Sequence, residues 1–425
     1  MRTLILNAGE IAHMSSGDAN MPLLGSEMSD KDLNVHSSGK GIVIESGVIT
    51  RIAESDELET EFVPSWVSGN GSFDGSNVID ARDRAIIPGF VDSHTHLLWA
   101  GDRSNEIALR QRGMTYAQIS EAGGGINKTV SETRKCTVEE LVSMGKHRLS
   151  EAQALGTTTI EVKSGYGLSI DSELRLLEAY GHISEQSRMD IHTTWLGAHD
   201  FPKDKKRSEY MDELISDQLP RVAEQGLSRW VDVFCEPGWF DIEQTERIVV
   251  AAKGLGLTPR LHVDEFVDSG GLTLASELGS VSADHVAHSN DESRERASKA
   301  GTMQTFLPGT PYVLGSNDYP PIDKCLENEW AFSLATDFNP NCNSLSIPFT
   351  GSLASHRCGI DPISALAAVT RNPSTTLGYG DEVSVGSISV GMDADMNILK
   401  GSEVEMWCQT PGMNPISTTI IKGVL

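Results

Sequence analysis

Apolar, strand-like runs alternate with helical stretches through the middle of this 425-residue chain, and eight such runs can be counted. This rhythm is typical of βα units, which build a parallel sheet. Eight units predict an α/β fold, a (β/α)8 TIM barrel, whose functional side chains lie at the carboxyl-terminal ends of the strands. The expected strands are Gly89–Ser93, Thr157–Val162, Asp190–Leu196, Val231–Cys235, Pro259–Val263, Val281–Asp284, Thr302–Leu307 and Phe332–Thr336.

The stretches between these runs carry helix signals. Thr137 and Glu140 fit a capping box, in which each side chain bonds to the backbone N–H of the other residue. Apolar residues follow at helical spacing, from Leu141 to Leu155. The sequence therefore predicts a helix that starts just after Thr137 and lies between two of the expected strands in the chain.

Both ends of the chain differ from the middle. Short alternating runs near the amino terminus are separated by Gly, Ser, Asn and Asp, as in small antiparallel sheets. Two runs near the carboxyl terminus, Gly391–Leu399 and Ile416–Ile421, have the same character. We therefore expect residues 1–86 and 380–425 to form one small β-sandwich-like domain beside a barrel of residues 87–379.

Charge and cysteine content limit the classes of partner. The formal net charge of −26 opposes binding to nucleic acid or to anionic membranes, so we expect a small-molecule partner. An anionic substrate would need a local basic pocket. The six cysteines form no Cys-x-x-Cys motif, which favours reduced thiols. Residues Met1–Glu10 lack the apolar stretch of a secretory signal, and the sequence predicts a cytoplasmic protein.

The first expected strand delivers two histidines, His94 and His96, to its end. On an extended strand residues i and i+2 point the same way, so both imidazoles can reach one metal ion. The pair alone is weak, because any strand can carry two histidines on one face. Further polar side chains follow later strands at corresponding positions, which predicts one shared site. They are Lys163 and Tyr166, His199, Glu236, His262 and Glu265, His285, and Asp337.

Four of these side chains, His94, His96, His262 and Asp337, form a ligand set that suits a divalent ion such as zinc or iron. The set leaves a position for water, whose pKa a metal would lower toward about 7. Two members have ordinary alternatives. His262 could be a core histidine bonded to backbone, and Asp337 could be a helix cap or turn residue. Taken together, the residues indicate a metal-dependent hydrolase.

The remaining strand-end residues have more than one candidate role. His285 is a candidate for proton transfer or for holding the reacting oxygen, with a second metal ligand as the alternative. We expect His288 to be structural. Glu236, at the end of the fourth strand, could support a second metal. Lys163 ends the second strand, which is a poor place from which to bridge two metals.

These residues and their surroundings resemble the amidohydrolase superfamily and, within it, the imidazolonepropionases, hydrolases of histidine breakdown. The resemblance covers most of the chain. His-x-His marks only the superfamily, whereas Lys-Ser-Gly-Tyr-Gly and His-Val-Asp-Glu-Phe, found together, are far more specific. The stretches that carry it are Pro88–Leu97, Ala100–Arg103, Gly123–Val130, Glu161–Leu168, Leu196–His199, Asp232–Glu236, Leu261–Phe266, Ser282–His285 and Ala335–Pro340.

The resemblance implies hydrolysis of 4-imidazolone-5-propanoate to N-formimidoyl-L-glutamate by a metal-activated water that attacks the ring amide carbonyl. Asp337 would transfer the proton, His285 would stabilise the oxyanion, and Glu265 would accept a ring N–H or steer the water. A single zinc or iron ion is implied, held by His94, His96, His262 and Asp337. A homodimer is also implied, although the sequence shows no interface.

The resemblance also implies a set of substrate contacts. Arg103 would be the guanidinium fork for the propanoate carboxylate, with a surface salt bridge as its ordinary alternative. Core packing is the alternative for Tyr166. The implied substrate contacts are Arg103, Tyr166, His199, Glu265 and Asn339.

The chain departs from the usual bacterial pattern just after Asn339. Many bacterial members have Gly-Thr or Gly-Ser after the Asn-Pro, where this chain has Asn341-Cys342, so contacts made there by family members are in doubt. Two other functions stay open. Another mononuclear amidohydrolase, such as a nucleobase deaminase or a cyclic amidase, would share the metal ligands but not Arg103 and Tyr166. A non-catalytic scaffold would keep the barrel without its chemistry.

Overall fold

The computed structural model describes residues 2–114, 118–119, 122–378 and 383–425, and its strands form two eight-stranded sheets. In the sheet formed by β7 to β14, the strands follow chain order and every neighbouring pair is parallel. This arrangement confirms the predicted (β/α)8 barrel. Its strands are β7 (Phe90–Asp92), β8 (Thr157–Lys163), β9 (Asp190–Ala198), β10 (Trp230–Cys235), β11 (Thr258–Val263), β12 (Ser282–His285), β13 (Met303–Phe306) and β14 (Phe332–Leu334).

The first and last strands of this sheet meet just beyond their carboxyl ends. Thr95 and Phe338 form an isolated parallel bridge, and the side chain of Asp92 accepts hydrogen bonds from the backbone and hydroxyl of Thr336 at 3.1 and 2.6 Å. These contacts place the segments that follow β7 and β14 side by side. Polar residues carried by those two segments therefore face a common space.

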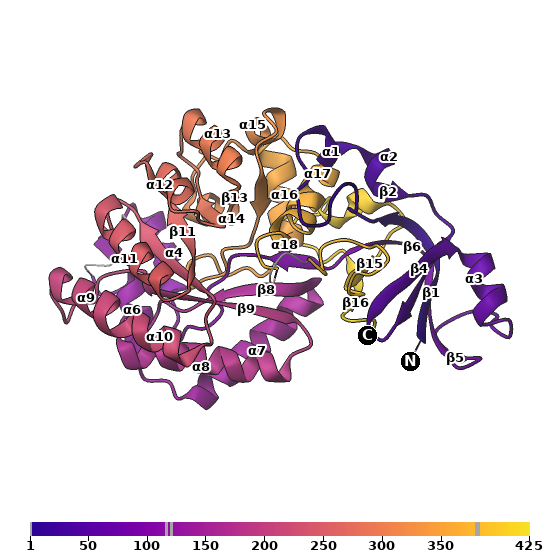
Figure 1. Cartoon of the computed structure of the whole chain (residues 1–425), viewed down its shortest axis with the longest axis horizontal. Helices are drawn as coiled ribbons and strands as arrows, with labels where there is room; N and C mark the ends of the chain where they lie inside the picture. The colour runs from indigo at the N-terminus through magenta and orange to yellow at the C-terminus, as the bar shows by residue number, and fades with distance from the viewer. Residues whose placement is uncertain (1, 115–117, 120–121, 379–382) are drawn as a thin grey trace.

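Helices surround the barrel and connect its strands (Figure 1). The predicted capping box is confirmed, since Thr137 and Glu140 exchange side-chain to backbone hydrogen bonds of 3.3 and 2.9 Å. The helices of the barrel region are α4 (Asn105–Gln111), α6 (Gly125–Thr133), α7 (Val138–Ala154), α8 (Ile170–Gln186), α9 (Arg207–Glu213), α10 (Leu219–Gln225), α11 (Ile242–Gly254), α12 (Gly271–Glu277), α13 (Asp291–Ala300), α14 (Gly309–Leu314), α15 (Ile322–Glu327), α16 (Ile347–Arg357), α17 (Pro362–Ala368) and α18 (Arg371–Ser374). None of the helices in the described part of the chain has the length and hydropathy needed to cross a bilayer.

Both ends of the chain contribute strands to the second sheet, and both termini lie on that side of the molecule (Figure 1). Its central order is β16-β15-β6-β1-β3-β4, with β2 on β1 and β5 on β6. The expected domain boundary at residues 379–380 lies outside the described residues. The strands are β1 (Arg2–Ala12), β2 (Val35–His36), β3 (Lys40–Glu45), β4 (Val48–Glu54), β5 (Gly71–Phe73), β6 (Ser76–Pro88), β15 (Met396–Leu399) and β16 (Ile416–Ile420), with helices α1 (Ser26–Ser29), α2 (Lys31–Asn34) and α3 (Ser55–Phe62) nearby.

One pairing differs from the expected antiparallel pattern, because β1 and β6 run parallel. The hairpin β3–β4 and helix α3 lie between these two strands in the chain. They bring the chain back so that β6 starts beside the start of β1. Apolar side chains alternate along β1, so that Leu4 and Leu6 belong to one buried cluster and Ile5 to another. The sheet is therefore buried on both faces, with Leu58 of α3 in the cluster on one face and Ile388, outside the strands, in the cluster on the other.

A single glycine connects the two sheets. Gly89 follows β6 directly and precedes β7, and a Cβ atom at this position would lie 2.2 Å from Oγ1 of Thr158. Only glycine allows the chain at this position to approach β8, which carries Thr158, so closely. This fixes the start of β7 and hence the position of the His-x-His segment at its end.

Candidate active site

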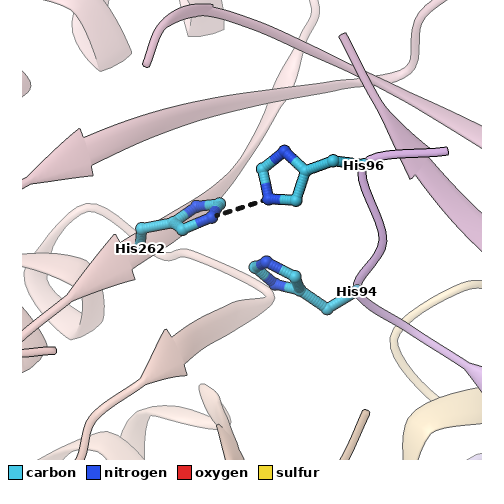
Figure 2. A group of neighbouring side chains, drawn as sticks. All are labelled: His94, His96 and His262. Atoms are coloured by element: carbon cyan, nitrogen blue, oxygen red, sulfur yellow. Dashed lines mark hydrogen bonds between the residues drawn. The ribbon is translucent and has the colours of Figure 1, made fainter. Parts of the chain in front are cut away.

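Three histidines from distant parts of the chain meet at the carboxyl ends of the barrel strands (Figure 2). His94 and His96 follow β7, and His262 lies on β11. The Nε2 atoms of His96 and His262 are 3.4 Å apart, and the rings of His94 and His262 lie 4.4 Å apart between centroids. All three side chains are buried, and one ligand atom of each lies within 4.8 Å of the others.

Asp337 completes this group from the segment after β14. One of its carboxylate oxygens, Oδ1, lies 3.6 Å from Nε2 of His94 and 3.7 Å from Nε2 of His96. The hydroxyl of Thr310 donates to the other oxygen at 2.5 Å, and the backbone N–H of Asp337 donates to the carbonyl of His94. Burial raises the pKa of Asp337 to about 6. We call His94, His96, His262 and Asp337 the metal cluster.

The hydrogen bonds around the metal cluster suit a bound cation. Nδ1 of His94 lies 2.7 Å from Oδ2 of Asp284, and Nδ1 of His262 lies 2.9 Å from Oδ2 of Asp232. A carboxylate accepts, so each Nδ1 carries the proton and each Nε2 presents a lone pair to the centre. Nε2 of His94 is buried without a hydrogen-bond partner among the described residues.

The charge state of the imidazoles agrees with this interpretation. Burial lowers the pKa of His94 and His96 well below the ordinary value, and nearby positive groups lower it further. Neutral imidazoles are the form that binds metal. Three neutral nitrogen donors and one carboxylate oxygen form a set that accepts a divalent ion.

Two more strand-end residues lie beside the metal cluster. Nε2 of His285, at the end of β12, is 3.6 Å from Oε2 of Glu265, which follows β11. Burial lowers the pKa of His285 and raises that of Glu265, and the nearby carboxylates of Asp337 and Glu236 raise the latter further. His285 also groups with His94 and Asp337 as a possible ligand set. The geometry of His285 thus fits both predicted roles, contact with the reacting groups and metal ligation.

Glu236 has a different environment from the metal cluster. Its Oε1 accepts hydrogen bonds from the backbone N–H groups of Glu265 and Phe266, so it holds the loop that carries Glu265. Burial raises the pKa of Glu236 to about 7. Among the described residues, no group of potential metal ligands includes Glu236. Its geometry favours support of the Glu265 loop.

A cavity of about 410 Å³ opens beside the metal cluster. The residues that the sequence predicts as substrate contacts all line it. They are Arg103, Tyr166, His199, Glu265 and Asn339. Three residues that sequence reasoning missed, Phe234, Trp239 and Phe266, form an aromatic wall, with Trp239 5.1 Å from Phe234 and 5.9 Å from Phe266 between ring centroids. Of these three, Phe266 could have been found from the sequence, because it directly follows the His262–Glu265 segment.

Arg103 is buried in the cavity wall and is not part of an ordinary surface salt bridge. Its Nε and Nη2 donate to the two carboxylate oxygens of Glu106, each at 2.9 Å, and Glu106 also accepts from the backbone N–H of Gly125. This pairing fixes the plane of the guanidinium. It also offsets the charge, so Arg103 presents an oriented donor in a nearly neutral pair.

Tyr166 and His199 contact the metal cluster through the ring of His96. His199 stacks on His96 at 4.9 Å between ring centroids, and Tyr166 lies 5.2 Å from His199. Nδ1 of His199 faces the carbonyl of Gly165 at 3.1 Å, and burial lowers the pKa of His199 to about 3. His199 is therefore a neutral hydrogen-bonding group rather than a cation.

The segment that departs from the usual pattern is held by side-chain hydrogen bonds. Oδ1 of Asn339 accepts from the backbone N–H groups of Asn341 and Cys342 at 2.7 and 2.9 Å. Asn341 lines the cavity, and its side-chain oxygen accepts from Nη1 of Arg110 at 2.5 Å. Cys342 is buried and faces the carbonyl of Thr336. In this chain Asn341 therefore connects the cavity wall to α4, which carries Arg110.

Lys163 does not line the cavity that the other predicted residues share. It is fully buried inside the barrel, 2.9 Å from carboxylates of both Glu161 and Asp232. Sequence reasoning did not identify Asp232 and Asp284 as partners of the metal-cluster histidines. The available signal was a single acidic residue within each of two short, fully buried strands, β10 and β12.

Comparison with known proteins gives three kinds of match. The model of the amidohydrolase family matches residues 249–425. Imidazolonepropionase of Symbiobacterium thermophilum is 40% identical over 402 residues, which are 93% of this chain and 90% of that protein. Imidazolonepropionase of Parabacteroides distasonis is 37% identical and covers 100% of this chain and 98% of its own length.

Solved structures share the fold at low sequence identity. Guanine deaminase of E. coli has a TM-score of 0.69 at 15% identity and covers 100% of this chain and 99% of its own. An adenosine deaminase from Xanthomonas campestris with bound zinc has a TM-score of 0.67 at 16% identity, covering 99% and 92%. At this identity the likeness establishes the barrel architecture alone.

Proposed function

The chain belongs to the imidazolonepropionase family of amidohydrolases, and we propose that it hydrolyses 4-imidazolone-5-propanoate to N-formimidoyl-L-glutamate in histidine degradation. Water adds to the ring carbonyl carbon, the bond from that carbon to the ring nitrogen breaks, and the nitrogen takes up a proton. The observation that carries this proposal is one cavity lined both by Arg103 and by three members of the metal cluster, His96, His262 and Asp337. The metal-binding side chains and the guanidinium that would bind an anion thus line the same cavity.

The family implies a divalent metal, and the donor set of the metal cluster fits one. We propose zinc or iron, because three imidazoles and one carboxylate suit either ion. When bound, such an ion lowers the pKa of a water molecule toward neutrality and polarises a carbonyl group. His94, His96, His262 and Asp337 would hold it.

The cavity walls orient the substrate. Arg103, fixed in plane by Glu106, donates to the propanoate carboxylate. Tyr166 and His199 contribute neutral polar contacts around the ring, and the aromatic wall packs against its apolar surface. The substrate carboxylate would thus join Glu106 as a partner of Arg103, in a cavity whose wall also holds the carboxyl groups of Glu265 and Asp337.

Three side chains would share the proton transfers. Asp337, whose pKa burial raises to about 6, accepts the proton of the attacking water and passes it to the departing ring nitrogen. His285 is neutral and offers a hydrogen bond to the developing oxyanion. Glu265 lies 3.6 Å from His285 and accepts the ring N–H or steers the water.

The direct test is incubation of the purified protein with 4-imidazolone-5-propanoate. We expect the ring absorbance to disappear, N-formimidoyl-L-glutamate to form, and a chelator to stop the reaction until zinc or iron is restored. Release of ammonia in place of that product would instead indicate a deaminase. An unchanged ring with fully metal-loaded protein would contradict the proposal.

A further inference from the structure

The interior of the barrel below the metal cluster contains five charged side chains, each with no exposed surface. We call these residues the charged core. They are Glu161 and Lys163 on β8, Asp232 on β10, Arg260 on β11 and Asp284 on β12. Buried charges are costly unless they are paired, so their arrangement requires an explanation beyond packing.

Lys163 is the centre of this arrangement. Its ammonium lies 2.9 Å from Oε1 of Glu161, 2.9 Å from Oδ2 of Asp232 and 3.7 Å from Oδ2 of Asp284. These carboxylates come from three different strands. The hydroxyl of Thr194 also donates to Oε1 of Glu161 and so holds this carboxylate in place.

The two aspartate oxygens that face Lys163 are the oxygens that bind the metal-cluster histidines. Oδ2 of Asp232 lies 2.9 Å from Nδ1 of His262, and Oδ2 of Asp284 lies 2.7 Å from Nδ1 of His94. Each oxygen therefore accepts from an imidazole on one side and faces the same ammonium on the other. One cation connects two ligands that are 168 residues apart.

The other buried cation does not duplicate this role. Arg260 donates to the carbonyls of Thr376 and Ser93, each at 3.2 Å. Among the described residues, Lys163 is the cation that contacts both Asp232 and Asp284. Without its ammonium, two carboxylates would face a dry space with no cation between them, and repulsion would turn at least one away from its histidine.

We propose that Lys163 is a positioning residue that fixes the orientation of both His94 and His262 through Asp284 and Asp232. The proposal rests on the metal cluster of the proposed function and concerns metal binding, not the identity of the substrate. Partners of metal-binding histidines commonly contribute 10- to 100-fold in metal affinity. Because Lys163 supports two such partners, its removal should affect both ligands together.

The test measures zinc affinity of the full chain by equilibrium competition with a chelator, without substrate. Lys163→Met removes the charge and keeps a similar volume, and we expect affinity to fall by roughly 10- to 100-fold. Arg371→Met is the matched control, because Arg371 is also buried but donates to the carbonyls of Met21 and Asp18 rather than to carboxylates of the charged core. We expect that control to keep wild-type zinc affinity even if its thermal stability falls.

A double-mutant cycle separates orientation from packing. If Lys163 acts through Asp284, the combined Lys163→Met and Asp284→Asn change costs less affinity than the sum of the two single changes. The visible spectrum of the cobalt-substituted protein should shift in Lys163→Met and be unchanged in Arg371→Met. Strictly additive losses, or wild-type affinity and spectrum in Lys163→Met, would overturn the proposal.

A second variant covers the case in which Lys163→Met does not fold. Lys163→Gln keeps an N–H donor in a neutral side chain, and we expect it to retain the fold while losing zinc affinity. Wild-type affinity in folded Lys163→Gln would equally overturn the proposal. Since no step uses the imidazolone, failure of the proposed substrate would leave these results unchanged.

Discussion

Nε2 of His96 lies 3.4 Å from Nε2 of His262, although the two residues are 166 positions apart in the chain. Two neutral imidazole nitrogens at this distance form a hydrogen bond only if one carries the proton. Nδ1 of His262 already carries its proton toward Asp232. In the absence of a cation, His96 is therefore the donor of this pair, whereas a bound cation would receive the lone pairs of both nitrogens.

Asp337 is expected to have two roles, as metal ligand and as proton carrier. Asp337→Asn keeps an oxygen donor but cannot take up a proton, so we expect kcat to fall by about 10²- to 10⁴-fold while the protein still binds some zinc. Steady-state kinetics with parallel metal analysis checks this. Near-normal kcat in the metal-loaded variant would rule out Asp337 as the proton carrier.

Arg103 is expected to act mainly in substrate binding. Arg103→Ala removes a charge-assisted hydrogen bond of about 1.5–3 kcal/mol, so KM should rise roughly tenfold to a hundredfold with a smaller change in kcat. The variant also leaves Glu106 buried without its partner, which adds repulsion toward the substrate carboxylate. Arg112→Ala, at an exposed position beyond α4, is the control. An unchanged KM would show that the carboxylate binds elsewhere.

Asp395 allows a prediction about stability and pH. It is buried near the contact between the two sheets, its Oδ1 accepts from the backbone N–H of Lys422, and its Oδ2 has no hydrogen-bond partner among the described residues. Burial raises the pKa of Asp395 from 3.8 to about 7. The folded protein therefore holds this proton more tightly than the unfolded chain, and stability falls as pH rises from about 4 to 7.

Asp395→Asn removes that penalty and keeps an acceptor for Lys422. We expect urea unfolding to show a gain of up to a few kcal/mol at pH 8, shrinking toward zero at pH 4 to 5. Asp217→Asn, at an exposed position, is the matched control for the loss of one acidic side chain. Destabilisation by Asp395→Asn at pH 8 would mean that the carboxylate is charged and favourable in the folded protein.

The barrel and most of the site residues could be predicted from the sequence. Apolar runs set the strands, and parallel strands bring their carboxyl ends to one face, so His262 and Asp337 were placed beside His94 by topology alone. The parallel pairing of β1 with β6 was not predicted, because the direction of pairing depends on how the intervening chain folds back.

The partners of the site residues were harder to predict. Asp284 contacts His94 across 190 positions, and this requires the register of β12 as well as its existence. Glu106 pairs with Arg103 only because helix α4 begins between them. Lys163 was considered for metal bridging, whereas its ammonium points into the barrel interior. In each case the sequence identified the element but not the direction of the side chain.

The most direct test of the metal cluster is the metal content of the purified protein, measured by mass spectrometry together with ring-opening activity. We predict one zinc or iron ion per chain, with both metal and activity lost in His262→Ala while the circular dichroism spectrum is kept. Full activity in a wild-type sample that holds far less than one metal ion per chain would contradict the account.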